Sequence, residues 1–184
     1  RRHTRFRNVT RVQTCALPIS WLQRRAEIGI QWTLPPFGHG EPKLEGLTPL
    51  LCDSQGGYRG SEFSLDTSIP PEWQRAVEVC EQTAKQLQRF GYFGPLGIDA
   101  AIYADAAGNV ISRPLQDVNA RFTMGRLTLG FRHLLRDGER GEWQHRRVAE
   151  LNPTSTEVVA REINLTPGLV GDKPPTHGSR LQIR

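Results

Sequence analysis

Hydrophobic and polar residues alternate along several short stretches of the chain, which is typical of β-strands with one buried face. The pattern predicts strands over residues 26–34, 47–52, 58–63, 97–103 and 110–118, and a further strand around residues 157–165. Turn-forming residues at 53–57 and 105–109 join two neighbouring pairs into antiparallel hairpins. We therefore expect a mainly antiparallel sheet.

Two other segments follow a helical period. Pro70 and Pro71 suit a first helical turn, and Gly91 is placed to end the helix that follows them. The apolar stripe of this helix consists of Trp73, Val77, Cys80, Ala84 and Leu87. A second stripe consists of Met124, Leu127, Phe131, Leu134 and Leu135. Because hairpins rather than parallel crossovers join the strands, the predicted fold class is α+β, with helices flanking a mainly antiparallel sheet.

The basic character of the chain belongs to its first 20 residues. The 184 residues have a formal net charge of +5, but residues 1–20 contain five arginines and no acidic residue. The other 164 residues therefore have a formal net charge of zero. That balance does not indicate a nucleic-acid partner. No apolar run reaches the ~18 residues of a membrane span, so we expect no membrane partner either.

Residues 1–20 also resemble a sequence that does not belong to the protein. Residues 12–19, VQTCALPI, match one translated reading frame of a common sequencing adapter, and the flanking residues fit the same frame except for Arg11. We therefore predict that residues 1–20 are a disordered artefact and that the natural sequence resumes near Trp21. The alternative is a genuine basic arm or a transit-like leader. The arginines favour this alternative, whereas the lack of an amphipathic period argues against it.

Three cysteines are present, and Cys15 lies in the suspect segment. Cys52 and Cys80 have no metal-ligand or redox spacing, which is typical of a reduced, cytoplasmic protein. Cys80 lies on the apolar face of the first helix, so we expect it to be buried.

Candidate chemistry concentrates in the hairpin of residues 97–103 and 110–118. Asp117 and Asn119 are two residues apart and so share one face of their strand, while Asp99 lies on the partner strand. Two carboxylates and an amide oxygen are hard donors that suit Mg²⁺. Arg121 follows directly and can hold an anion. The pattern predicts a magnesium site beside an anion-binding guanidinium.

A regular hairpin would not bring Asp99 and Asp117 close enough together. If its turn centres between Ala106 and Ala107, Asp99 pairs with Pro114 and lies about 10 Å along the strand from Asp117, too far to share an ion. A wider loop or a bulge is required, and Pro114, which cannot donate to a ladder, offers a place for it. The alternative is purely structural: Asn119 caps the following helix and Arg121 is a solvated charge.

The block GYFGPLGIDAAIY, then DVNAR, then TMG opening a helix, resembles the C-terminal subdomain of the ATP-grasp superfamily. This resemblance implies that Asp99, Asp117 and Asn119 bind Mg²⁺, with Mn²⁺ as a substitute. It also implies that Arg121 is catalytic and stabilises the transferring phosphoryl group or the acyl-phosphate oxygens. The spacing from Asp99 to Asp117 is longer than in carboxylase-type members, which makes that pairing the weaker part of the motif.

A second match is shorter. Trp21-Leu22 followed by Glu27 is similar to the strand after the adenine-contacting hinge of these enzymes, so that the hinge itself would lie just before Trp21. Residues 21–135 are thus predicted to be this subdomain, truncated on its N-terminal side, and residues 136–184 to be an extension with one strand. Glu27 and Arg59 are candidate nucleotide contacts, with a plain sheet position and a solvated surface charge as their alternatives.

The resemblance implies a fragment of an ATP- and Mg²⁺-dependent ligase. Such an enzyme activates a carboxylate through an acyl phosphate for attack by an amine or a similar nucleophile. The expected partners are a nucleotide and a small-molecule carboxylate, and the fragment alone is expected to be inactive because a second subdomain must close over the nucleotide. The alternative is a non-catalytic nucleotide-binding or interaction module that keeps the fold.

Overall fold

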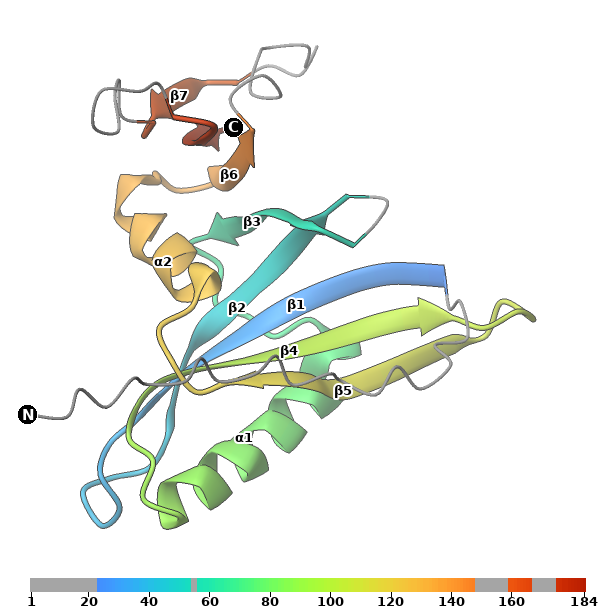
Figure 1. Cartoon of the computed structure of the whole chain (residues 1–184), viewed down its shortest axis with the longest axis vertical. Helices are drawn as coiled ribbons and strands as arrows, with labels where there is room; N and C mark the ends of the chain where they lie inside the picture. Colours follow the sequence, from blue (N-terminus) through green and yellow to red (C-terminus); the bar gives the residue numbers. More distant parts are fainter. Residues whose placement is uncertain (1–22, 54–55, 148–158, 167–174) are drawn as a thin grey trace, which may run out of the picture.

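One eight-stranded sheet forms the frame of the protein (Figure 1). The computed structural model describes residues 23–53, 56–147, 159–166 and 175–184, so the predictions for residues 1–20 and for Trp21-Leu22 lie outside the described residues. All neighbouring strands are antiparallel, which confirms the predicted α+β fold class. In order across the sheet, the strands are β5 (Val110–Asn119), β4 (Gly94–Ala104), β1 (Gln23–Leu34), β2 (Lys43–Cys52), β3 (Tyr58–Ser64), β6 (Arg140–Arg147), β8 (His177–Ile183) and β7 (Arg161–Asn164).

Helix α1 (Gln74–Arg89) covers one face of the half-sheet formed by β5, β4 and β1 (Figure 1). It follows a short 3-10 turn, η1 (Pro71–Trp73), and ends at Gly91, whose φ of +91° suits glycine. The predicted apolar stripe is confirmed, with Cys80 fully buried. It packs on buried side chains of β1 and β4, among them Ile28, Ile30, Trp32, Leu34, Leu96, Ile98 and Ala100.

A second core lies under the other half of the sheet. It consists of Phe63, Leu135, Trp143, Leu181 and Ile183. The predicted second helix is shorter than expected: α2 (Met124–Gly130) gives way to a 3-10 turn, η2 (Phe131–Leu134), which brings Phe131 and Leu134 against this core. Met124 and Leu127 of the predicted stripe are exposed instead, because α2 packs through Gly125, Thr128 and Leu129.

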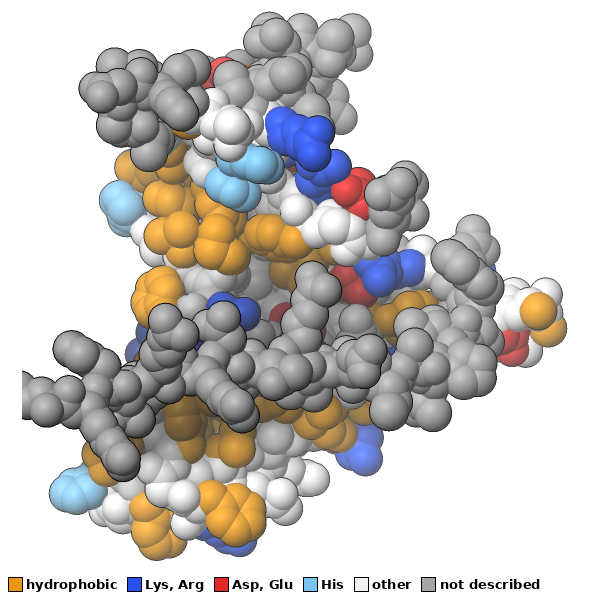
Figure 2. Space-filling view, viewed as in Figure 1, with side chains coloured by type: hydrophobic (Ala, Val, Ile, Leu, Met, Phe, Trp, Pro, Cys, Tyr) orange, Lys and Arg blue, Asp and Glu red, His pale blue; other side chains and the backbone are white. Residues whose placement is uncertain are grey.

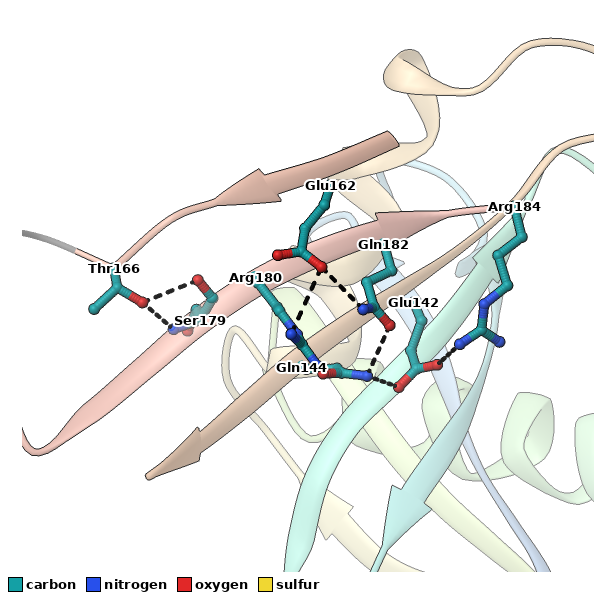
Figure 3. Close-up of polar contacts among 8 residues, drawn as sticks. All are labelled: Glu142, Gln144, Glu162, Thr166, Ser179, Arg180, Gln182 and Arg184. Atoms are coloured by element: carbon teal, nitrogen blue, oxygen red, sulfur yellow. Dashed lines mark hydrogen bonds and ion pairs between the residues drawn. The ribbon is translucent and has the colours of Figure 1, made fainter. Parts of the chain in front are cut away.

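Strands β6 and β8 were not predicted. Only one strand was expected after residue 136, and its described part is β7; residues 157 and 158 lie outside the described residues. Both missed strands have a buried face that is polar, and Figure 3 shows the contacts that its side chains make with one another. Gln144 donates to Gln182 at 3.2 Å and accepts from Nε of Arg180 at 2.8 Å, so these side chains are buried with partners. Each strand has only one or two large apolar residues, Trp143 in β6 and Leu181 and Ile183 in β8, so the alternating pattern is short.

The predicted boundary after residue 135 falls in the connection between η2 and β6, and β6 then pairs with β3. No helix within the described ranges is long and apolar enough to cross a membrane.

Candidate functional site

The β4–β5 hairpin contains the bulge that its sequence required. Regular pairing runs from Ala104 and Val110 to Ala101 and Arg113, and then resumes with Asp99 opposite Asp117. Residues 114–116 therefore lie opposite a single residue of β4. The regular hairpin, in which Asp99 would pair with Pro114, does not occur, because the turn centres on residue 107 and the bulge inserts two extra residues. The predicted position of the bulge at residue 114 is confirmed.

Cross-strand pairing places the candidate residues on one face of the sheet. Directly opposed residues of antiparallel strands share a face. Asp99 opposes Asp117 on one side and Gly29 on the other, while Gly97 opposes Asn119. The intervening residue, Ile98, is fully buried in the core beneath α1. The site therefore lies on the face of the sheet away from α1.

One amide links the predicted metal ligands. Nδ2 of Asn119 lies 3.2 Å from an oxygen of Asp99 and 3.3 Å from an oxygen of Asp117. Its Oδ1 accepts from Nη2 of Arg121 at 2.9 Å. The two carboxylates thus share a single partially positive group, and the four predicted residues form one connected network.

Asp99 is the electrostatically unusual member of this network. Burial, then the neighbouring carboxylates of Asp117 and Glu27, raise its pKa from the ordinary 3.8 to about 6. The hydrogen bond from Asn119 and the charge of Arg121 act in the opposite direction but do not cancel the rise. A cation between the carboxylates would remove much of this repulsion.

Glu27 stands beside the carboxylate pair, on β1. Its side chain is only 8% exposed and lies 3.0 Å from Nε of Arg24. It also accepts from the thiol of Cys52 at 3.2 Å and from Nε2 of Gln116 at 3.3 Å. Burial and this carboxylate together raise the pKa of Cys52 to about 11. Glu27 is therefore a well-anchored negative charge at the edge of the site.

Gln116 is a site neighbour to which sequence reasoning gave no role. Its amide accepts from the hydroxyl of Tyr103 and donates to Glu27, so it connects β5 to β4 and β1. The available signal was its position directly before Asp117 in a segment that had to bulge.

Arg59 lies on β3, which β1 and β2 separate from β4. Its Nη2 is 2.9 Å from a carboxylate oxygen of Asp53. The structure therefore brings Arg59 to Asp53, and its contact with a phosphate stays a prediction.

The hairpin residues fit a magnesium ion by their chemistry. No group of three or more His, Cys, Asp or Glu residues that could hold a metal occurs in the described part of the chain. A site here would combine the carboxylates of Asp99 and Asp117 with the amide oxygen of Asn119, all of them oxygen donors of the kind Mg²⁺ prefers. To present that oxygen, the Asn119 amide must turn over, which breaks its bond from Nη2 of Arg121 and leaves the guanidinium with only its contact from Nη1 to the Phe122 carbonyl at 3.4 Å among the described residues.

No protein-family model matches this chain, and no curated protein matches it significantly. Similar solved structures include the biotin carboxylase domain of a single-chain bacterial carboxylase, with a TM-score of 0.48 and 9% identity. They also include N5-carboxyaminoimidazole synthetase from Staphylococcus aureus complexed with ADP, with a TM-score of 0.46 and 10% identity. Each match covers 89% of this chain but only 44% and 47% of the other chains, respectively, so this chain spans less than half of their length.

Both are ATP-grasp enzymes, the superfamily that the sequence resembles. At these scores the likeness does not bear on function, which we infer from the hairpin itself.

Proposed function

We propose that the chain is part of an ATP- and Mg²⁺-dependent ligase that activates a carboxylate as an acyl phosphate for attack by an amine or a similar nucleophile. The observation that carries this proposal is the convergence of Asp99, Asp117 and Asn119 on one face of the β4–β5 hairpin, with Arg121 bonded to Asn119. The DVNAR motif suggested these residues, and the bulge supports the suggestion by bringing the two carboxylates opposite each other.

Each residue then has a distinct role. The carboxylates of Asp99 and Asp117 and the amide oxygen of Asn119 would hold the ion, which neutralises phosphate charge when bound. Arg121 is exposed, so its guanidinium can reach a phosphoryl oxygen once the Asn119 amide releases it. Glu27 contributes negative charge beside the ion and orients the nucleotide. Arg59 would exchange Asp53 for a phosphate oxygen.

The test is Mn²⁺ binding to the full chain, followed by electron paramagnetic resonance with and without ADP. We expect ADP to strengthen Mn²⁺ binding, and Asp117→Asn to weaken it by at least about tenfold. Glu78→Gln is the matched control, since this carboxylate is exposed on α1 and pairs only with Arg75 among the described residues. Equal Mn²⁺ affinity in the parent chain and in Asp117→Asn would refute the proposed site.

A further inference from the structure

The two-residue bulge in β5 must be held by specific contacts, because the hydrophobic pattern does not select it. A shift of two residues keeps every side chain outside the bulge on its own face of a strand. Asp117 and Asn119 would therefore face the same side of the sheet in a regular hairpin. Continuing the pairing of Ala101 with Arg113 would, however, place Leu115 opposite Asp99.

That regular register would destroy the carboxylate pair. Asp117 would become a diagonal neighbour of Asp99, with Cβ atoms about 7–8 Å apart instead of about 5 Å. The closer arrangement lets both carboxylates bind one ion through bonds of about 2.1 Å. The bulge is thus the feature of the backbone that creates the site.

Gln116 distinguishes the two registers. In the bulged register its amide accepts from Tyr103 and donates to Glu27. In the regular register it would pair with Ile98, a residue whose side chain is fully buried under α1. Its polar amide would then face the apolar side of the sheet and lose both partners, which is unfavourable. Pro114 adds to the preference, since its carbonyl accepts from the Cys80 thiol at 3.5 Å.

We propose that Gln116 is a positioning residue, which fixes the bulged register through Tyr103 and Glu27 and thereby holds Asp117 opposite Asp99 for cation binding. The last clause rests on the proposed function, whereas the register itself does not. Among the described residues, the Gln116 side chain bonds to Tyr103 and Glu27 and to neither carboxylate of the pair, so it acts through the backbone of β5.

Disulfide trapping reads the register without any ligand. Two double variants, Asp99→Cys with Asp117→Cys and Asp99→Cys with Leu115→Cys, are made in the full chain with Cys15→Ser and Cys52→Ser. Buried Cys80 is kept because it contacts Pro114. Directly opposed residues have Cα atoms about 4.5–5.5 Å apart and can be bridged, whereas pairs beyond about 7 Å cannot. Peptide mapping by mass spectrometry identifies the bridges that form.

We expect the 99–117 bridge to exceed the 99–115 bridge by at least about tenfold in the parent background, because only the first pair is directly opposed. Gln116→Met, which keeps the length of the side chain but loses both hydrogen bonds, should lower this ratio at least about fivefold, since its apolar side chain suits the regular register. Val110→Met, on the same strand but outside the bulge, should leave the ratio unchanged. An unchanged ratio in Gln116→Met would overturn the proposal, whatever happens to metal affinity.

Mn²⁺ binding supplies the second readout, in chains that retain Asp99 and Asp117. We expect Gln116→Met to weaken Mn²⁺ binding at least about tenfold, as is usual when support of a metal ligand is lost. A changed bridge ratio together with no Mn²⁺ binding by the parent chain would sustain the positioning of the carboxylates and refute the magnesium site. The two hypotheses can thus fail separately.

Discussion

Asp99→Asn should stabilise the folded chain at neutral pH although it removes a candidate ligand. The carboxyl group is partly buried and faces the charges of Asp117 and Glu27, which together with burial raise its pKa to about 6. Because the folded state holds this proton more tightly than the unfolded state does, the resulting stabilisation is complete below about pH 4 and is lost as the pH rises through about 6. At pH 7.5 the folded chain therefore carries an unfavourable charge that asparagine lacks.

The size of this effect follows from the pKa. A rise from 3.8 to about 6 corresponds to ~3 kcal/mol of unfolding free energy. Since the side chain is partly exposed, solvent screening reduces the expected gain to about 1–2 kcal/mol. For a chain of this length that gain raises the melting temperature by roughly 3–6 °C.

Urea unfolding of the parent and of Asp99→Asn between pH 4 and pH 8 measures this difference directly. The parent should lose stability as the pH rises through about 6, whereas the variant should not show this loss. Asp117→Asn offers an independent check by carboxyl-carbon NMR, since removal of the neighbouring charge should lower the pKa of Asp99. Destabilisation of the chain at pH 7.5 by Asp99→Asn would refute this reasoning, because it would mean that the ionised carboxylate is held by net favourable contacts.

Three further predictions concern a cysteine beside the site, the second core and the start of α2. Glu27→Gln, in a chain with Cys15→Ser, should lower the pKa of Cys52, because it removes the carboxylate beside the thiol. Alkylation of Cys52 by iodoacetamide at pH 8.5, followed by mass spectrometry, should then be about threefold faster, while buried Cys80 stays unreactive. An unchanged alkylation rate of Cys52 would contradict this prediction. Gly141→Ala should lower the free energy of unfolding in urea by about 1–3 kcal/mol or more, because its new methyl group would lie 2.1 Å from Cζ of Phe63. The control is Gly130→Ala, whose methyl group meets nothing within 4 Å and should leave the stability nearly unchanged. Similar unfolding free energies for the two variants would contradict the packing argument. Thr123→Val should cost about 1–2 kcal/mol in the same assay, because the Thr123 hydroxyl caps α2 through Arg126 N and donates to Gln31; no loss would show that the cap is not needed.

The sequence was most informative where residue chemistry restricts the backbone. The apolar stripe of α1 and its end at Gly91 could be predicted because burial and a positive φ each leave few alternatives. The need for a bulge near Pro114 could also be deduced, since the site would otherwise not close. The size of the bulge could not be predicted. The turn centres half a residue later than the sequence suggested, and two registers that differ by two residues bury the same face of the strand outside the bulge.

The elements that were not predicted correctly depend on contacts between residues far apart in the sequence. Strands β6 and β8 bury Gln144, Arg180 and Gln182 against one another, and such burial depends on partners distant in the sequence. The end of α2 at Gly130 depends on how Phe131 meets Phe63, with ring centroids 6.1 Å apart, which periodicity alone does not contain. Tertiary contacts therefore override the local pattern in the half of the molecule away from the candidate site.

One face of the half-sheet formed by β5, β4 and β1 stabilises the fold, whereas the other face, which carries the site, opposes folding. The stability of the first face allows the site to be kept. Under α1, side chains such as Ile30 and Ile98 are fully buried, and each contributes about 1.5–3 kcal/mol. On the other face, Asp99 and Asp117 oppose each other directly, an arrangement that disfavours folding. Since an uncharged pair would make a more stable hairpin, the contacts of Gln116 and Asn119 hold a conformation that local stability alone does not favour. Such a conformation is stabilised when a divalent cation binds, because the ion turns the repulsion between the carboxylates into shared coordination.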